Sequence, residues 1–158
     1  MRVSGSYILD SDPTEVWGRV FDPASLASLI PGCERLVQIS SDEYRGEMSL
    51  ALPAVSGSFE TYVKILEQRE PDICRLKGEI TGPTGIIAGT AFFSLQQVDA
   101  QTRLEYQGDA LITGALAKMP ARFIEGVAAT LLRKGLAKLN KDLQRGSPEQ
   151  QQAVVSGG

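Results

Sequence analysis

The stretch "KMPARFIEGVAATLLRKGLAKLNKDLQR", residues 118–145, predicts the longest helix of the chain and decides how the rest must fold. Its apolar residues recur every three or four positions, which is typical of an amphipathic helix that covers a core. They form one broad stripe: Ile124, Val127, Ala128, Leu131, Leu132, Leu136, Leu139 and Leu143. Because no other long helix is predicted, any sheet must bury its inner face largely against this one.

The region before this helix predicts strands. Five segments between residues 42 and 112 alternate apolar and polar side chains, and turn-forming residues separate them. With an N-terminal strand over residues 2–10, they predict a sheet of about six to seven antiparallel strands. Clean alternation of this kind indicates one buried face and one wet face.

Two short helices are predicted directly after the first strand. Asp12-Pro13 and Asp22-Pro23 each join an N-cap side chain to a proline at the first helical position, and Glu15 extends the first cap to a capping box. Pro31 ends the second helix, because the residue before a proline disfavours helical geometry.

These elements predict an α+β fold in which a curved antiparallel sheet wraps around the C-terminal helix. An internal cavity is expected where the strands stand away from the helix. We expect residues 1–145 to form a single domain, and the small, polar residues 146–158 to form a disordered tail.

The composition excludes several functions. The 158 residues carry a formal net charge of −3, which does not favour nucleic acids. The chain has no histidine, which excludes Ser-His-Asp and Cys-His catalysis, and two cysteines alone cannot complete a zinc site. We therefore expect no metal and no cofactor. The sequence shows neither a membrane-length apolar run nor a signal peptide, so a cytoplasmic location is expected.

Two motifs resemble reactive sites, but other interpretations are favoured. Cys33 has no histidine to activate it, and neighbouring Glu34 disfavours a thiolate, so we interpret it as a small wall residue at the cavity mouth. Cys74 is interpreted as an inward-facing wall residue. The glycine-rich stretch 78–89 lacks the Gly-Lys-Ser/Thr ending of a phosphate loop and predicts a connection between strands.

The inward positions are aliphatic and aromatic, which favours a hydrophobic ligand. The strand carboxylates fall on the outward face, so no acid–base pair is predicted, whereas Tyr106 or Thr90 could orient a head group. The residues expected to line the cavity are Ile30, Cys33, Tyr44, Met48, Leu50, Phe59, Val63, Leu76, Phe93, Tyr106, Phe123, Ile124, Val127, Ala128 and Leu131.

Two features of the long helix each have two interpretations. Gly126 and Gly135 weaken a helix interior, either to permit close packing or to leave room for a ligand. Lys134, Lys138, Lys141 and Arg145 form one basic stripe. The stripe is either a solvated face near the helix C-terminus or a docking surface for an acidic partner or anionic lipid.

Several motifs together resemble a known family: "FDPASLASL" (21–29), "IPGCE" (30–34), "YRGEMSLALPAVSGSF" (44–59), "GTAFFSL" (89–95) and "TRLEYQGDALITGALAKM" (102–119). They are similar to the family of the carbon monoxide dehydrogenase G subunit, within the START-like (SRPBCC) helix-grip superfamily, over about residues 2–143. The resemblance implies a partnership with a molybdenum hydroxylase of the carbon monoxide dehydrogenase type, through maturation, membrane tethering or quinone transfer. Some members carry a C-terminal membrane anchor. The tail here has neither an apolar nor a basic anchor, so only transient membrane contact is expected.

The sequence thus predicts a non-enzymatic carrier of a hydrophobic quinone or lipid that is accessory to such a hydroxylase. The expected location is the cytoplasm, with possible contact at the inner face of the membrane. Two alternatives stay open. One is a polyketide cyclase- or dehydratase-like enzyme with Tyr44 and Tyr106 as candidate catalytic residues. The other is a protein-only assembly or membrane-recruitment factor that acts through the basic stripe or the outer sheet face.

Overall fold

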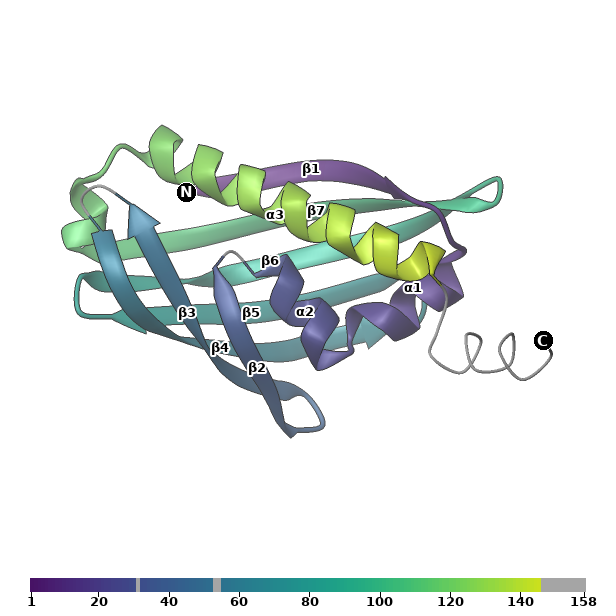
Figure 1. Cartoon of the computed structure of the whole chain (residues 1–158), viewed down its shortest axis with the longest axis horizontal. Helices are drawn as coiled ribbons and strands as arrows, with labels where there is room; N and C mark the ends of the chain where they lie inside the picture. Colours follow the sequence, from purple (N-terminus) through teal and green to yellow (C-terminus); the bar gives the residue numbers. More distant parts are fainter. Residues whose placement is uncertain (31, 53–54, 146–158) are drawn as a thin grey trace.

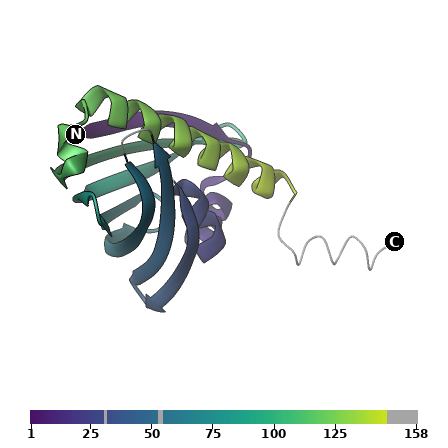
Figure 2. The same ribbon diagram turned by 60° about the vertical axis from the view of Figure 1, so that its left-hand side comes forward.

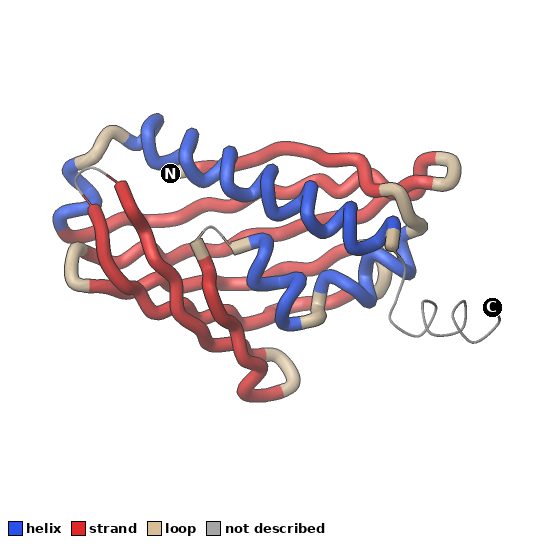
Figure 3. The backbone as a smooth tube through the Cα atoms, in the orientation of Figure 1, coloured by secondary structure: helices blue, strands red, loops and turns tan. Residues whose placement is uncertain are grey.

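The computed structural model describes residues 1–30, 32–52 and 55–145, without the side chains of residues 50–52, 55 and 56. The predicted tail therefore lies outside the described residues. Figures 1 and 3 show the elements in order. They are β1 (Arg2–Leu9), α1 (Pro13–Val20), α2 (Pro23–Leu29), β2 (Cys33–Ser40), β3 (Glu43–Leu52), β4 (Val55–Arg69), β5 (Ile73–Gly82), β6 (Gly85–Val98), β7 (Gln101–Gly114), the 3-10 helix η1 (Ala115–Lys118) and α3 (Ala121–Gln144).

The seven strands form one sheet in the order β1-β7-β6-β5-β4-β3-β2, and every neighbouring pair is antiparallel. The sheet bends around α3, which lies across its concave side, while β2 and β3 curve away from the N-terminal part of the helix (Figure 2). The predicted α+β architecture is confirmed. The glycine-rich stretch 78–89 is the hairpin between β5 and β6, in which Gly82 pairs with Gly85.

Strand alternation places the apolar face inward as predicted. In β4, Phe59, Thr61, Val63 and Ile65 are buried, whereas Glu60 between them is exposed.

Strand β2 was missed by the sequence analysis. This edge strand carries Val37 and Ile39 on its exposed face and buries only Leu36. An edge strand with apolar residues facing solvent lacks the clean period-two signal.

The helix starts follow the predicted caps. The Asp12 carboxylate accepts a hydrogen bond from the Glu15 backbone N–H at 2.9 Å, and Asp22 accepts one from Ser25 at 3.4 Å. Helix α3 begins three residues later than expected, at Ala121, with Pro120 as its N-cap.

Helix α3 is anchored by its C-terminal half. Its buried residues there include Leu136, Leu139 and Leu143, and the helix packs against α2 and β1. At its end the Asp10 carboxylate accepts hydrogen bonds from Asn140 at 3.0 Å and from Gln144 at 2.7 Å. This polar clamp attaches the last turns of α3 to the end of β1.

Gly135 marks the point where α2 and α3 cross at backbone contact. A Cβ atom at this position would lie 2.0 Å from the Ser28 carbonyl oxygen. At Gly126 the same atom would meet nothing within 4 Å. Close packing therefore explains Gly135, against a helix rather than the sheet, and does not explain Gly126.

Candidate functional site

Two adjoining hollows lie on the concave side of the sheet. The inner chamber, of about 220 Å³, lies between the sheet and helices α2 and α3. The distal chamber, of about 250 Å³, adjoins it over the middle of the sheet, and within the described residues no part of α3 lines it. Both are lined by Val3, Ile30, Val63, Leu76, Ala91 and Gly108. The cavity thus extends from beneath α3 onto a part of the sheet that α3 does not cover.

The inner chamber is apolar. Most of its wall consists of aliphatic and aromatic side chains: Val20, Leu26, Leu29, Val63, Leu76, Phe93, Leu104, Leu132 and Leu136. Tyr106 brings a hydroxyl group to this wall, and its ring occupies the space that a side chain on Gly5 would need. Within the described part of the chain, this hydroxyl has no hydrogen-bond partner. It is therefore available to a polar group of a ligand.

A third hollow, the portal groove, lies outside the inner chamber and measures about 670 Å³. Helices α2 and α3 and the start of β2 form it, with Ser28, Ile30, Cys33, Glu34, Arg35, Leu131, Lys134 and Lys138 in its walls. Ile30 lines the portal groove and both chambers. The groove and the two chambers therefore meet at this residue.

The turn that carries Ile30 is held in place by its backbone. The Cys33 N–H donates to the Ile30 carbonyl at 3.1 Å, and Gly32 has a φ of 71°, which favours glycine. The Gly32 carbonyl in turn accepts from the Ser49 N–H of β3 at 3.1 Å. The "IPGCE" motif thus builds the connection between the groove and the sheet.

The surroundings of both cysteine thiols raise their pKa. Burial and the nearby Glu34 charge raise the pKa of Cys33, and a backbone hydrogen bond with Arg35 opposes this shift. The Cys33 thiol donates to the Arg35 carbonyl at 3.4 Å. Burial raises the pKa of Cys74 to about 12. Because the thiolate is the reactive form, this environment disfavours nucleophilic chemistry at either residue.

Tyr44, Met48 and Phe59 were wrongly expected in the cavity wall. All three are buried, but they fill the core and line neither chamber. The Tyr44 hydroxyl donates to the Phe21 carbonyl at 3.2 Å, and burial raises its pKa. Met48 and Phe59 pack with Leu116 of η1. Alternation identified their face of the sheet, but not the depth at which other elements would cover them.

The N-terminal half of α3 also differs from expectation. Phe123, Ile124, Val127 and Ala128 line neither chamber, and Phe123 is 43% exposed. Val127 lies two helical turns before the exposed residue Lys134, and residues two turns apart share a helix face. This face of α3 therefore does not point into the chambers, and the predicted apolar stripe was too broad.

The remaining expected cavity residues divide between the hollows. Ile30, Val63, Leu76, Phe93 and Tyr106 line the inner chamber, whereas Cys33 and Leu131 line the portal groove. The Leu50 side chain lies outside the described residues. The expected list missed Leu26 and Leu29 of α2, whose spacing of three residues was the available signal, together with Leu132 and Leu136 from the stripe.

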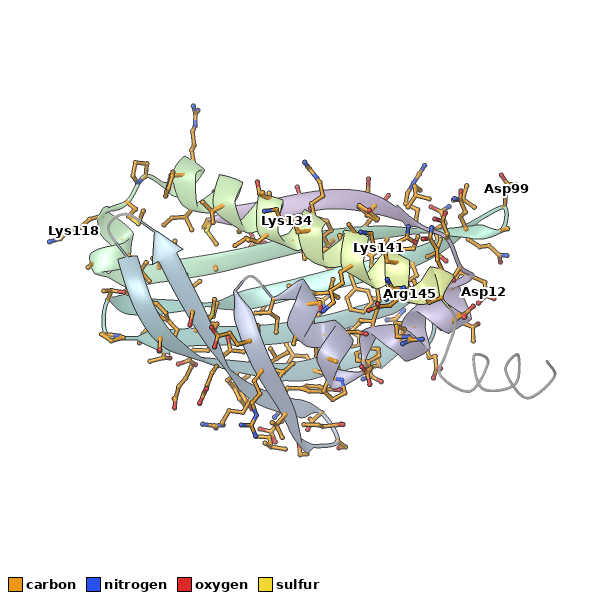
Figure 4. All side chains as sticks on the ribbon, viewed as in Figure 1. Asp12, Asp99, Lys118, Lys134, Lys141 and Arg145 are labelled. Atoms are coloured by element: carbon orange, nitrogen blue, oxygen red, sulfur yellow. The ribbon has the colours of Figure 1, made fainter. Side chains whose placement is uncertain are left out.

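The basic stripe lies along the exposed side of α3, where Figure 4 labels three of its members. Lys134 and Lys138 line the portal groove, whereas Lys141 and Arg145 continue toward the helix end.

Among the described helices, none is long and apolar enough to cross a membrane.

The architecture defines the class of protein. A START superfamily protein from Mycobacterium smegmatis is 14% identical, with 90% of this chain and 98% of that chain covered and a TM-score of 0.65. DynU16, from the dynemicin biosynthetic locus, is also 14% identical over 93% of this chain and 48% of that chain, with a TM-score of 0.58. At these identities the likeness concerns the fold alone, which is the START-like helix-grip fold.

A closer likeness and a family match narrow this class. A conserved protein from Geobacillus kaustophilus is 26% identical, with 92% of this chain and 96% of that chain covered and a TM-score of 0.85. The model of the family of the carbon monoxide dehydrogenase G subunit (CoxG) matches residues 5–144, so the chain belongs to this family. The comparison with curated proteins gave no match.

Proposed function

We propose that the protein is a non-enzymatic carrier of a hydrophobic ligand, either a quinone or a lipid. The apolar inner chamber, which shares six lining residues with the distal chamber, is the observation that carries the proposal. Ligand cavities commonly measure about 300–1,000 Å³, and the two chambers together lie within this range. Each buried Å² of apolar ligand surface would contribute about 25 cal/mol, so an acyl or isoprenoid chain needs no charged contact to bind.

Family membership supports the biological setting of the proposal. The carrier would serve a molybdenum hydroxylase of the carbon monoxide dehydrogenase type as an accessory protein. It would work in the cytoplasm and collect its ligand during transient contact with the inner face of the membrane. The exposed basic stripe on α3 suits such contact, because anionic headgroups attract clustered lysines.

The enzyme alternative finds less support in the site. The Tyr44 hydroxyl is engaged by the Phe21 carbonyl, away from both chambers. Tyr106 stands in an otherwise apolar wall, where its hydroxyl can orient a ligand. The protein-only assembly role stays a prediction, and a pull-down with the hydroxylase by ligand-free protein would favour it.

Ligand binding by a cavity-filling variant tests the proposal. Gly108 lines both chambers, and a Cβ there would make ordinary contact, 3.6 Å from the Ala91 Cβ. Gly108→Leu should therefore fold and fill the cavity. Gly18→Leu is a matched control, because a Cβ on this exposed α1 residue meets nothing within 4 Å.

The measurement is titration of delipidated protein with a short-chain ubiquinone and with dodecanol, followed by native mass spectrometry. Wild type and Gly18→Leu should bind at least one of them. Gly108→Leu should bind at least about ten-fold more weakly, a loss of about 1.4 kcal/mol. Equal binding by the folded Gly108→Leu protein, or no binding by wild type, contradicts the carrier.

A further inference from the structure

We propose that the portal groove holds the anionic head group of an amphiphile whose apolar chain lies in the inner chamber. The proposal rests on the proposed carrier function and narrows its ligand to a chain with a carboxylate or phosphate head. A neutral quinone would leave this second subsite unused.

The charge in the groove is the first argument. Arg35, Lys134 and Lys138 line it, against the single carboxylate of Glu34. This positive concentration occurs on a chain whose formal net charge is −3. Within the described residues, none of the three cations forms an ion pair. Cations left without a carboxylate partner can each donate charge-assisted hydrogen bonds to a bound anion.

The position of the lysines on α3 is the second argument. A helix C-terminus favours cations, but this effect falls off within the last turn. Lys141 lies in that last turn, whereas Lys134 and Lys138 lie one to three turns before the end at Gln144. The helix dipole therefore accounts for Lys141 and leaves Lys134 and Lys138 to be explained by the groove that they line.

The connection between groove and cavity is the third argument. Ile30 belongs to the walls of the portal groove and of both chambers, so the groove and the chambers meet at this residue. Leu131 and Leu36 add apolar surface to the groove next to its cations. A ligand that passes Ile30 would thus leave a polar end in the groove and place its chain against Leu76 and Phe93.

The experiment compares two ligands with the same chain. Dodecanoate and dodecanol are titrated against a displaced fluorescent probe at low salt, in wild type and in the double variant Lys134→Gln/Lys138→Gln. Wild type should prefer dodecanoate, and high salt should remove the preference, because screening weakens exposed charge pairs. The double variant should bind dodecanoate about ten-fold more weakly and dodecanol unchanged.

Two further variants and one competitor test whether the effect is located in the groove. Lys141→Gln removes an equal charge from the same helix outside the groove and should change neither affinity. Glu34→Gln removes the carboxylate of the groove and should strengthen dodecanoate binding. Acetate should not compete, because the site needs the chain as well as the anion.

The possible failures are distinguishable. If neither dodecanoate nor dodecanol binds but the short-chain ubiquinone does, the carrier stands and this inference fails. If none of the three ligands binds, the carrier function fails as well. If wild type binds both ligands equally and the double variant changes neither affinity, the carrier function is still supported, and the proposal of an anionic subsite is overturned. If acetate competes as strongly as dodecanoate, the proposal of an amphiphilic ligand is also overturned, because the groove would then bind free anions.

Discussion

The two halves of α3 contact the rest of the protein in very different ways. In the C-terminal half, Leu136 and Leu139 are each 1% exposed, Gly135 meets the backbone of α2, and Asn140 and Gln144 bind Asp10. In the N-terminal half, Phe123 and Gly126 are exposed. Within the described residues, this half contributes no residue to the distal chamber. The C-terminal half therefore closes the core and borders the inner chamber through Leu136, whereas the N-terminal half leaves the distal chamber uncovered.

The difference explains how a small domain can be stable and still hollow. Close packing at one end supplies the free energy of folding, since buried apolar area is the main favourable contribution. The other end can then do without complete contact between helix and sheet. Substitutions in the two halves should consequently have unequal effects, and they are considered below from the largest to the smallest.

Leu139→Ala should have the largest effect. It removes a side chain that is 1% exposed and leaves a cavity in the packed half, which typically lowers the free energy of unfolding by about 3 kcal/mol. Val127→Ala in the open half is the control and should lower it by less than about 1 kcal/mol, because Val127 is only half-buried. Denaturant unfolding measures both. Equal losses would contradict the division of the helix.

Gly135→Ala should have the second-largest effect. Its Cβ would stand 2.0 Å from the Ser28 carbonyl oxygen, so α2 and α3 must move apart. Overpacking of this kind lowers the free energy of unfolding by about 1–3 kcal/mol. A thermal midpoint at or above the wild-type value would show that the crossing is not tight.

Gly126→Ala should act in the opposite direction. Its Cβ meets nothing within 4 Å, so the substitution only reduces the flexibility of a helix interior. Alanine should raise the free energy of unfolding by about 0.5–1 kcal/mol. Ligand titration of the same variant completes the test: unchanged affinity is expected, since Gly126 lines neither chamber.

The smallest effect is expected at the polar clamp. Hydrogen bonds from Asn140, Gln101 and Gln144 lower the pKa of Asp10. A lowered folded-state pKa contributes stability above the unfolded-state value, near pH 4, that is lost as the pH falls through the folded-state value. The thermal midpoints of wild type and Asp10→Asn should therefore differ most near neutral pH and converge in acid. Asp99→Asn, at an exposed turn, is the control and should parallel wild type throughout.

Local features of the sequence predicted most of the fold. Asp12 and Asp22 cap their helices because a cap needs only a side-chain oxygen three residues before a free N–H. Phe59, Val63 and Ile65 face inward because side chains alternate along a strand, whatever covers them later. The same period predicted that Val63 and Leu76 would share a face, and both line the cavity.

The position of the cavity could not be predicted in this way. Tyr44 and Tyr106 are both inward-facing tyrosines, yet Tyr44 is buried with its hydroxyl bound to Phe21, between α1 and α2, and Tyr106 lies at a chamber wall. The portal groove joins Arg35 to Lys134 and Lys138, residues about a hundred positions apart whose meeting depends on how α2 and α3 cross. Periodicity is a property of a single strand or helix, so the sequence by itself determined most of the elements, the inward face of most strands, and the family. Whether an inward side chain fills the core or borders a hollow depends on which distant element lies above it, and only the tertiary structure decided that.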